Sequence, residues 1–94
     1  MGIWFITYAK MTPEFMAKSR PERAKDMEWL KEQAAKHGVH MLMWGHPYGV
    51  NENLVIVYQS SNGVENYNNM VLYDQKIYTD SRTTVTVLEY DPSR

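Results

Sequence analysis

The sequence predicts an α+β fold with the element order β-α-β-β-α-β. Four runs of β-branched, aromatic and aliphatic residues have the composition of strands, and two other segments have apolar residues at helical spacing. Proline, glycine and helix-capping residues separate these segments from one another. A chain of 94 residues has room for one modest hydrophobic core, so we expect residues 1–94 to form a single domain.

The first strand is predicted at residues 3–10, IWFITYAK, which contain no breaker and are apolar on both faces. This composition is typical of a central strand. Thr12, Pro13 and Glu14 then provide a cap residue, a proline at the first helical position and an acid in the first turn. A helix is therefore expected to begin there.

A longer helix is predicted to follow after a short turn. Ser19 and Glu22 have the spacing of a capping box, which restarts a helix rather than ending one. The helix continues to His37, and Gly38 is expected to adopt the left-handed conformation just beyond its end. Its buried stripe consists of residues at helical spacing: Met27, Leu30 and Ala34.

The second half of the chain predicts a hairpin, a second helix and a last strand. The hairpin has strands at residues 39–46 and 53–60, joined through a His-Pro-Tyr-Gly turn. The helix spans about residues 62–78, because Asn62 and Glu65 again space a cap residue and an acid. Its inward-facing residues are expected to be Val64, Tyr67, Val71 and either Ile77 or Tyr78. Residues 83–90, TTVTVLEY, alternate clearly and form the fourth strand after Asp80-Ser81-Arg82 has ended the helix.

This order is the split βαβ arrangement, in which a four-stranded antiparallel sheet carries both helices on one face. Strand alternation divides the sheet's side chains into two sets. The set expected under the helices is mostly aliphatic: Ile3, Phe5, Thr7, Val39, Met41, Met43, Val55, Val57, Val85 and Val87. The set expected on the open face is rich in aromatic, hydroxyl and imidazole groups: Trp4, Ile6, Tyr8, His40, Leu42, Trp44, His46, Leu54, Ile56, Tyr58, Thr84, Thr86, Leu88 and Tyr90. The reverse assignment, with the aromatic set under the helices, is the open alternative.

An open face of this composition is too apolar to be left in water. Small monomers rarely expose a contiguous apolar patch larger than about a few hundred Å². The economical cover is a second copy that packs its own sheet against the first. We therefore expect a homodimer formed through the open sheet face.

The whole chain resembles the dimeric α/β-barrel superfamily, whose ferredoxin-like subunits pair their sheets into a barrel. The resemblance rests on the element order, on IWFITYAK as first strand, on the long helix after TPEF and on the hairpin around WGHPYG. It implies a ferredoxin-like βαββαβ sandwich. Relatives include small cofactor-free monooxygenases of the antibiotic-biosynthesis type, haem-degrading and haem-dependent enzymes, muconolactone isomerases, and EthD-like and YCII-like proteins. No catalytic residue of any one branch can be matched, so none is carried over.

His46 is the candidate catalytic residue. It lies where the second strand meets the turn, at a sheet end where a pocket could open, and imidazole transfers protons near neutral pH. The alternative is a turn histidine hydrogen-bonded to the backbone. The candidate ligand-binding residues are Tyr8, His40, Trp44 and Tyr58. Tyr8, Trp44 and Tyr58 could form the wall of an apolar cavity with polar tips, whereas His40 lies at the other end of the second strand from His46. For each of these, ordinary packing in the core or interface is the alternative.

No metal site and no cofactor are expected. The chain has no cysteine, which excludes disulfides, thiolate catalysis and sulfur-ligand metal sites. His40 and His46 share a strand face but lie about 20 Å apart at ~3.3 Å per residue, so one metal ion cannot use both. Asp74 and Glu89 could act as bases if buried, although exposure is the default for both. Haem bound through one histidine is a weaker option.

Charge and hydropathy indicate which classes of partner and which location the sequence favours. The ten lysine and arginine residues are scattered among eleven acids, with a net charge of -1, which argues against nucleic acid and an anionic membrane surface. The absence of a membrane-spanning run and of signal-peptide features favours a cytoplasmic location.

Two functions follow from these predictions. One is a small cytoplasmic homodimer that binds a compact apolar or aromatic ligand, as a cofactor-independent oxygenase or isomerase. The other is a non-enzymatic assembly or regulatory module whose aromatic sheet face is only the dimer interface.

Overall fold

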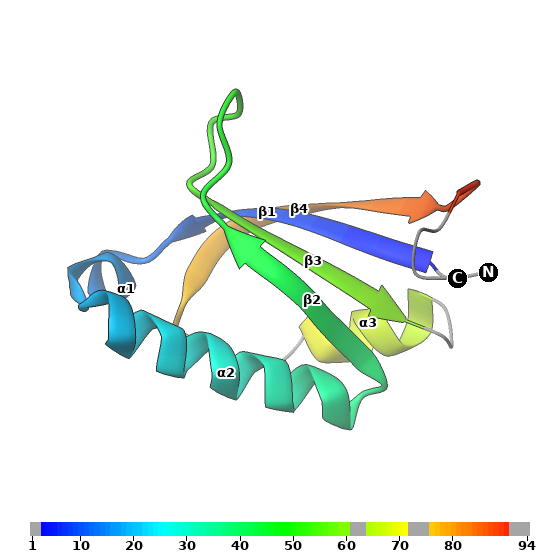
Figure 1. The fold of residues 1–94 in the computed structure, drawn as a ribbon, viewed down its shortest axis with the longest axis horizontal. Coiled ribbons are helices and arrows are strands. Elements are labelled where there is room, and N and C mark those ends of the chain that lie inside the picture. Colours follow the sequence, from blue (N-terminus) through cyan, green and yellow to red (C-terminus); the bar gives the residue numbers. More distant parts are fainter. Residues whose placement is uncertain (1–2, 61–63, 72–75, 91–94) are drawn as a thin grey trace.

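A computed structural model describes residues 3–60, 64–71 and 76–90, with side-chain burial given for all of these except residues 68–71. The elements follow one another as β1 (Ile3–Met11), α1 (Pro13–Ala17), α2 (Arg20–Lys36), β2 (Val39–Gly45), β3 (Leu54–Ser60), α3 (Val64–Val71) and β4 (Tyr78–Val87). The strands form one sheet in the order β2-β3-β1-β4, with every neighbouring pair antiparallel. All helices lie on one side of this sheet (Figure 1). The predicted α+β fold with a four-stranded antiparallel sheet is confirmed.

The predicted helix starts and stop lie where the sequence places them. The Thr12 hydroxyl accepts a hydrogen bond from the Phe15 amide at 3.1 Å and caps α1. Ser19 and Glu22 form both hydrogen bonds of a capping box, at 3.3 and 3.0 Å, and so begin α2. Gly38 has a φ of 74°, which is the left-handed conformation expected beyond the end of α2.

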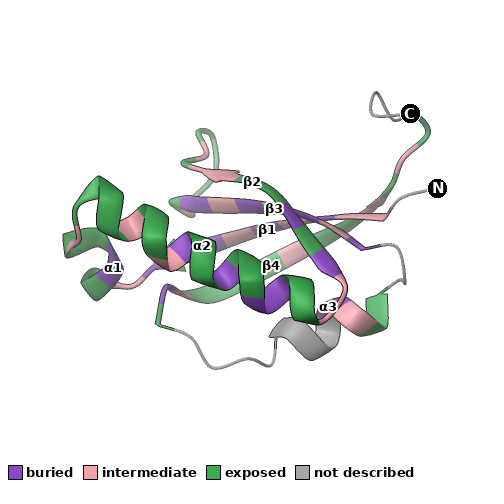
Figure 2. Cartoon of the chain, turned by 60° about the horizontal axis from the view of Figure 1, so that its bottom comes forward, coloured by how far each residue is buried: buried purple, intermediate pink, exposed green. Residues whose placement is uncertain are grey.

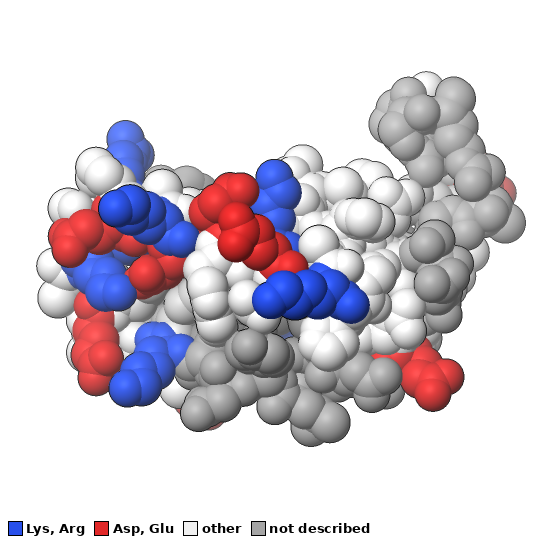
Figure 3. Space-filling model, turned by 90° about the horizontal axis from the view of Figure 1, so that it is seen from below, with Lys and Arg blue, Asp and Glu red and all other residues white. Residues whose placement is uncertain are grey.

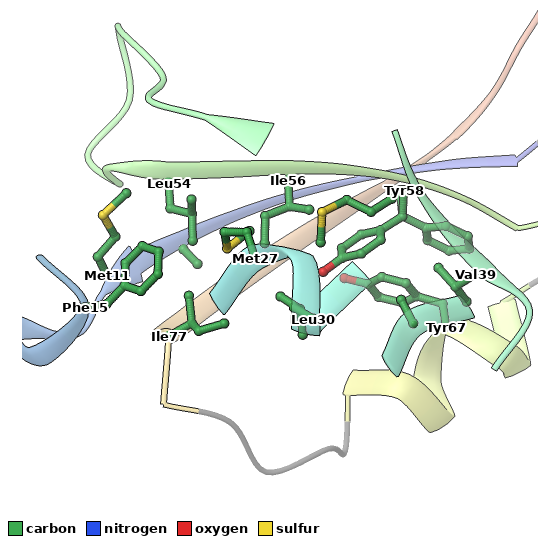
Figure 4. Packing of buried hydrophobic residues seen from close by; sticks show 14 residues of the cluster. Met11, Phe15, Met27, Leu30, Val39, Leu54, Ile56, Tyr58, Tyr67 and Ile77 are labelled. Atoms are coloured by element: carbon green, nitrogen blue, oxygen red, sulfur yellow. The ribbon is translucent and has the colours of Figure 1, made fainter. Parts of the chain in front are cut away.

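The hydrophobic core lies between the sheet and the helices (Figures 2 and 4). The predicted stripe of α2 is confirmed, because Met27, Leu30 and Ala34 are all buried there. The remaining core residues come from β1, β2, β3, α1, α3 and the residue just before β4: Phe5, Ala9, Met11, Phe15, Val39, Met41, Leu54, Ile56, Tyr58, Tyr67 and Ile77.

The predicted faces are correct for β1 and wrong for β3. Phe5 and Thr7 are buried under the helices as expected. Directly opposite residues of antiparallel strands share a face, and Phe5 pairs with Tyr58 while Thr7 pairs with Ile56. Tyr58 and Ile56 therefore belong to the core, and Val55 lies on the open face. Strand β3 is apolar at both parities, so its alternation alone could not orient it.

The prediction for Trp44 is also wrong, because β2 contains an irregularity. The β2–β3 register shifts between Met41 and Met43, so that Trp44 pairs with Ile56 and packs against the core. An extra residue in one strand reverses the parity of every side chain after it. Met43 is consequently exposed, although the sequence places it under the helices.

The second helix is shorter than predicted. Helix α3 spans Val64–Val71, and β4 already begins at Tyr78, where the sequence predicts the helix to end. Of the predicted inward residues, Tyr67 is buried but Val64 is 44% exposed. Residues 80–82 lie within β4, and Asp80 has a φ of 50° near a register shift. The predicted cap at Asn62 and the candidate base Asp74 lie outside the described residues.

The helical surface is polar. Lysine, arginine, aspartate and glutamate side chains of both signs are interspersed over α1 and α2 in Figure 3. Among the described helices, none combines the length and the hydropathy needed to cross a membrane.

Candidate functional site

The open face of the sheet carries three rows of paired residues, which define the candidate site. Reading across β2, β3, β1 and β4, the rows follow from the strand registers: His40, Gln59, Trp4 and Thr86; Met43, Val57, Ile6 and Thr84; Gly45, Val55, Tyr8 and Arg82. The middle row is mainly apolar, and the outer rows mix aromatic, polar and charged groups. Ile6 and Val57 at the centre are only half-buried, because no element of the described chain covers them.

A charged and aromatic cluster occupies one end of this face. The Arg82 guanidinium lies 4.6 Å from the centre of the Tyr8 ring, within cation–π distance. Arg82 also donates two hydrogen bonds to the Glu52 carboxylate, at 2.5 and 3.1 Å. The ion pair links the loop before β3 to β4, on the far side of β1. The Glu52 side chain is only 10% exposed, so its carboxylate is shielded from solvent. The cluster combines a π face, a cation and an anion at one position.

The Arg82–Glu52 pair was missed in the sequence. Arg82 falls in the segment expected to end a helix, and Glu52 falls in a hairpin loop. The pairing of β4 with β1 places Arg82 opposite Tyr8, where its side chain also reaches Glu52. Nothing in local periodicity could have shown this, because residues 52 and 82 are far apart in the chain.

Trp4 adds a second polar feature to the open face. Its indole Nε1 is buried, and it has no hydrogen-bond partner among the described residues. A buried donor without a partner costs about 1–3 kcal/mol. An acceptor supplied by a ligand or by another chain would remove this cost.

The two candidate histidines lie apart. His40 is exposed and belongs to the row at the opposite end from Tyr8. His46 is also exposed, beyond the end of β2. The His46 Nδ1 lies 3.3 Å from the Asn53 carbonyl oxygen, and its ring meets the Trp44 ring edge-on at 6.2 Å. These contacts agree with a turn histidine bonded to backbone, so the catalytic role of His46 stays a prediction.

Tyr58 lies on the other side of the sheet from Tyr8, and the two cannot line one wall in a single chain. Figure 4 shows the Tyr58 and Tyr67 side chains together in the core between the sheet and the helices. Their rings meet edge-on at 5.7 Å, and Tyr67 stacks on Phe5 at 4.3 Å. The Tyr58 hydroxyl is buried, with Tyr78 and Tyr67 as its tyrosine neighbours.

Three hydroxyls beside Tyr58 form a closed triangle that the sequence did not reveal. The Tyr67 hydroxyl lies 2.5 Å from the Thr7 hydroxyl and 2.7 Å from that of Thr83. Thr7 and Thr83 are themselves 2.9 Å apart. Because β1 and β4 pair these two threonines directly, the register positions them to receive a tyrosine from α3.

Burial keeps the nearby phenols protonated. Desolvation raises the pKa of Tyr58 well above its ordinary value, and the neighbouring Tyr78 and Tyr67 add to the increase. Burial also raises the pKa of Tyr78 to about 12. At neutral pH both phenols are therefore hydrogen-bonding groups and cannot act as general bases.

Several clefts border the helices. One, of about 170 Å³, lies between α1, α2 and Lys76, with Phe15 and Trp29 in its lining. A second, of about 450 Å³, shares Glu14 and Lys76 with the first. A third, of about 230 Å³, lies between α2 and β2, and its lining includes Trp44 as well as Met43 of the open face. Of the predicted ligand-binding residues, Trp44 therefore borders a cleft on the helical side, whereas Tyr8 and His40 lie on the open face.

The described residues contain no group of three histidine, aspartate or glutamate side chains that could hold a metal ion. Glu89 is exposed. The polar and aromatic groups that the described residues bring to the open face include the Arg82–Glu52 pair, Tyr8, Trp4 and His40.

Among known proteins, the similarities to this chain are found in solved structures. Neither protein-family models nor curated proteins match the sequence. A mutant chlorite dismutase from Candidatus Nitrospira defluvii is similar over 88% of this chain, with 13% identity and a TM-score of 0.53. This chain covers only 39% of that protein. An uncharacterized NIPSNAP domain protein from Burkholderia xenovorans is similar over 98% of this chain and 99% of its own length, with 10% identity and a TM-score of 0.55.

At these identities the likeness shows the fold alone. The chain has a ferredoxin-like fold, as its sequence predicted.

Proposed function

We propose that the protein is a cytoplasmic homodimer that binds a compact apolar or aromatic ligand between the paired open faces of its sheets. The observation that carries this proposal is the uncovered face around Ile6 and Val57. These side chains lie at the centre of a sheet whose other face is covered by helices. Pairing two such faces removes the apolar centre of each from water and encloses the polar groups at its ends.

The polar ends of the face favour a ligand rather than a uniformly dry interface. The Arg82–Glu52 pair is internally neutralised, so two copies can approach without a strong like-charge penalty. Tyr8 and Trp4 offer flat surfaces for an aromatic ring. Arg82, beside Tyr8, offers a donor for an oxygen atom of such a ligand. Trp4 lies at the opposite end of the face, four residues or about 13 Å away along β1.

One chain supplies only one wall of the proposed site, because no described element covers Ile6 and Val57. A compact ligand needs a concave apolar surface, which two facing sheets would supply. The second candidate function, an assembly module without a ligand, would bury the same apolar centre against a second copy. Whether a small molecule is held separates the two functions.

The catalytic part of the proposal is an oxygenase or isomerase reaction without a cofactor, with His46 as the proton-transfer group. His46 lies at the sheet end that also carries Tyr8 and the Arg82–Glu52 pair, since Gly45, Tyr8 and Arg82 share one row. Once a ligand is known, His46→Ala should abolish turnover and leave ligand binding within about threefold. Unchanged turnover would exclude this role.

Native mass spectrometry of the freshly purified protein tests the proposal. We expect two chains plus a small-molecule mass. Ile6→Glu places a charge at the centre of the paired faces and should give monomers without the extra mass. Ala35→Glu, a matched control at an exposed position of α2, should retain both.

Two bare chains that dissociate in Ile6→Glu would support the assembly module. A monomeric wild-type protein at about 100 µM would exclude both functions, because weaker pairing falls short of a stable interface.

A further inference from the structure

The β2–β3 hairpin extends beyond the sheet as an arm, which we define as residues 46–53. Figure 1 shows this arm rising from the end of β2 and β3 on the side opposite to the helices. Tyr48 near its tip is 98% exposed, and Val50 is 37% exposed. A large aromatic residue therefore projects into solvent on the same side as the open face.

The base of the arm is held in place. The Asn53 side-chain oxygen accepts a hydrogen bond from the Met11 amide at 2.8 Å, and the Asn53 carbonyl lies 3.3 Å from His46. Glu52 binds Arg82 of β4 through two hydrogen bonds. These contacts join the arm to β1 and β4 and fix the direction in which it leaves the sheet.

The arm is long enough to pass a second sheet. With about four residues in each limb, it reaches about 13 Å at ~3.3 Å per residue. Two sheets packed face to face lie about 10 Å apart. A second copy on the open face would therefore have the tip of this arm at the level of its own sheet.

The sheet face alone is small for a stable dimer. Strands β1 to β4 have 9, 7, 7 and 10 residues. At about 4.8 Å between strands and ~3.3 Å per residue they present a projected area of about 520 Å², whereas a standard interface buries about 800 Å² of accessible surface per partner. One tyrosine can bury about 150–250 Å². The two arms of a symmetric dimer would supply much of the missing area.

We propose that the arm grips a second copy of this chain, and that Tyr48 of each copy packs against its partner beside the paired sheets. This inference rests on the proposed homodimer and adds the segment that completes its interface. Tyrosine is a frequent hot-spot residue because it buries a large area with few rotatable bonds. By symmetry, each copy both donates and receives one arm.

The dissociation constant of the dimer, measured by sedimentation equilibrium, tests this inference. Tyr48→Ser should raise it by about tenfold or more, as expected for loss of a hot-spot side chain. Tyr48→Phe, which keeps the ring, should stay within about threefold. Val64→Ser is the matched control, since Val64 is an exposed apolar residue on the helical side.

Tyr48 is almost fully exposed in the single chain, so Tyr48→Ser should not alter the far-UV circular dichroism spectrum. If it leaves the dissociation constant within twofold while Ile6→Glu gives monomers, the arm does not grip and the paired sheets stand. If Tyr48→Ser dissociates the dimer but Ile6→Glu does not, the sheets do not pair, and both proposals fail. A monomeric wild-type protein also overturns both.

Discussion

The hydroxyl triangle of Thr7, Tyr67 and Thr83 explains how polar side chains are accommodated in the core. Each hydroxyl has one proton to donate, and a ring of three hydrogen bonds uses all three donors. Buried polar groups with complete partners stabilise a specific packing, whereas a partly satisfied group costs free energy. The triangle therefore links α3 to β1 and β4 in one arrangement.

Removing one hydroxyl should leave the other two incompletely paired. We expect Tyr67→Phe to lower the free energy of unfolding by about 1–3 kcal/mol, measured by urea denaturation. Tyr48→Phe is the matched control and should change it by less than about 0.5 kcal/mol at a concentration where the protein is monomeric, because Tyr48 is 98% exposed. Equal effects of the two substitutions would contradict a stabilising role for the triangle.

The Arg82–Glu52 pair should make stability depend on pH. The Arg82 guanidinium hydrogen-bonded to Glu52 lowers the pKa of that carboxyl below its ordinary value of 4.5. A carboxyl with a lowered folded-state pKa contributes stability above its unfolded-state pKa, and this contribution disappears as the pH falls through the folded-state pKa.

We therefore expect Arg82→Ala to destabilise the protein at pH 7, and we expect this destabilisation to shrink progressively as the pH falls below 4.5. Urea denaturation midpoints of both proteins at pH 7 and at a pH well below 4.5 measure this difference. Because Arg82 is half-exposed, added salt should also reduce the effect at pH 7. A difference between the two proteins that is the same at both pH values would show that Arg82 acts only through packing on Tyr8.

Among the secondary-structure elements, the helices show how local signals act. The capping box of Ser19 and Glu22 pairs backbone donors that would otherwise lack partners at the start of α2. We expect Ser19→Ala to lower the free energy of unfolding by about 1 kcal/mol. Glu22→Gln keeps an acceptor at the same position and should cost less. Thermal or urea unfolding of the wild type and the two variants measures these losses of stability. A larger loss for Glu22→Gln than for Ser19→Ala would contradict this account.

The strands show which features the local sequence does not predict, namely which face of a strand points toward the helices. In β3, Val55 and Ile56 are equally suitable for a core, and pairing with β1 decides which of them faces the helices. In β2, the shift between Met41 and Met43 turns Trp44 toward the core. A pattern of period two carries no information on an inserted residue, so the error in β2 could not have been found from its own sequence.

The complete subunit has one covered and one uncovered sheet face, and this asymmetry governs its association. If the uncovered faces pair, unfolding is coupled to dissociation and the melting temperature depends on protein concentration. For a dimer of this size we expect an increase of about 3 °C for each tenfold rise in concentration. Ile6→Glu should melt at a temperature independent of concentration, as measured by differential scanning calorimetry.

The sequence by itself determined the element order, the capped starts of α1 and α2, the end of α2 at Gly38 and the core stripe of α2. These features depend on residues close together in the chain, whose spacing is visible in the sequence. It also divided the side chains of β1 correctly into two sets, although only the structure shows that Trp4, Ile6 and Tyr8 lie on the open face.

Only the tertiary structure decided which groups meet. It placed Tyr58 and Trp44 in or against the core, joined Arg82 to Glu52 over Tyr8, and closed the triangle of hydroxyls. It also showed that the hairpin containing Tyr48 rises on the uncovered side of the sheet. These contacts join residues distant in the chain, and they depend on strand register, which is set by the simultaneous packing of all four strands.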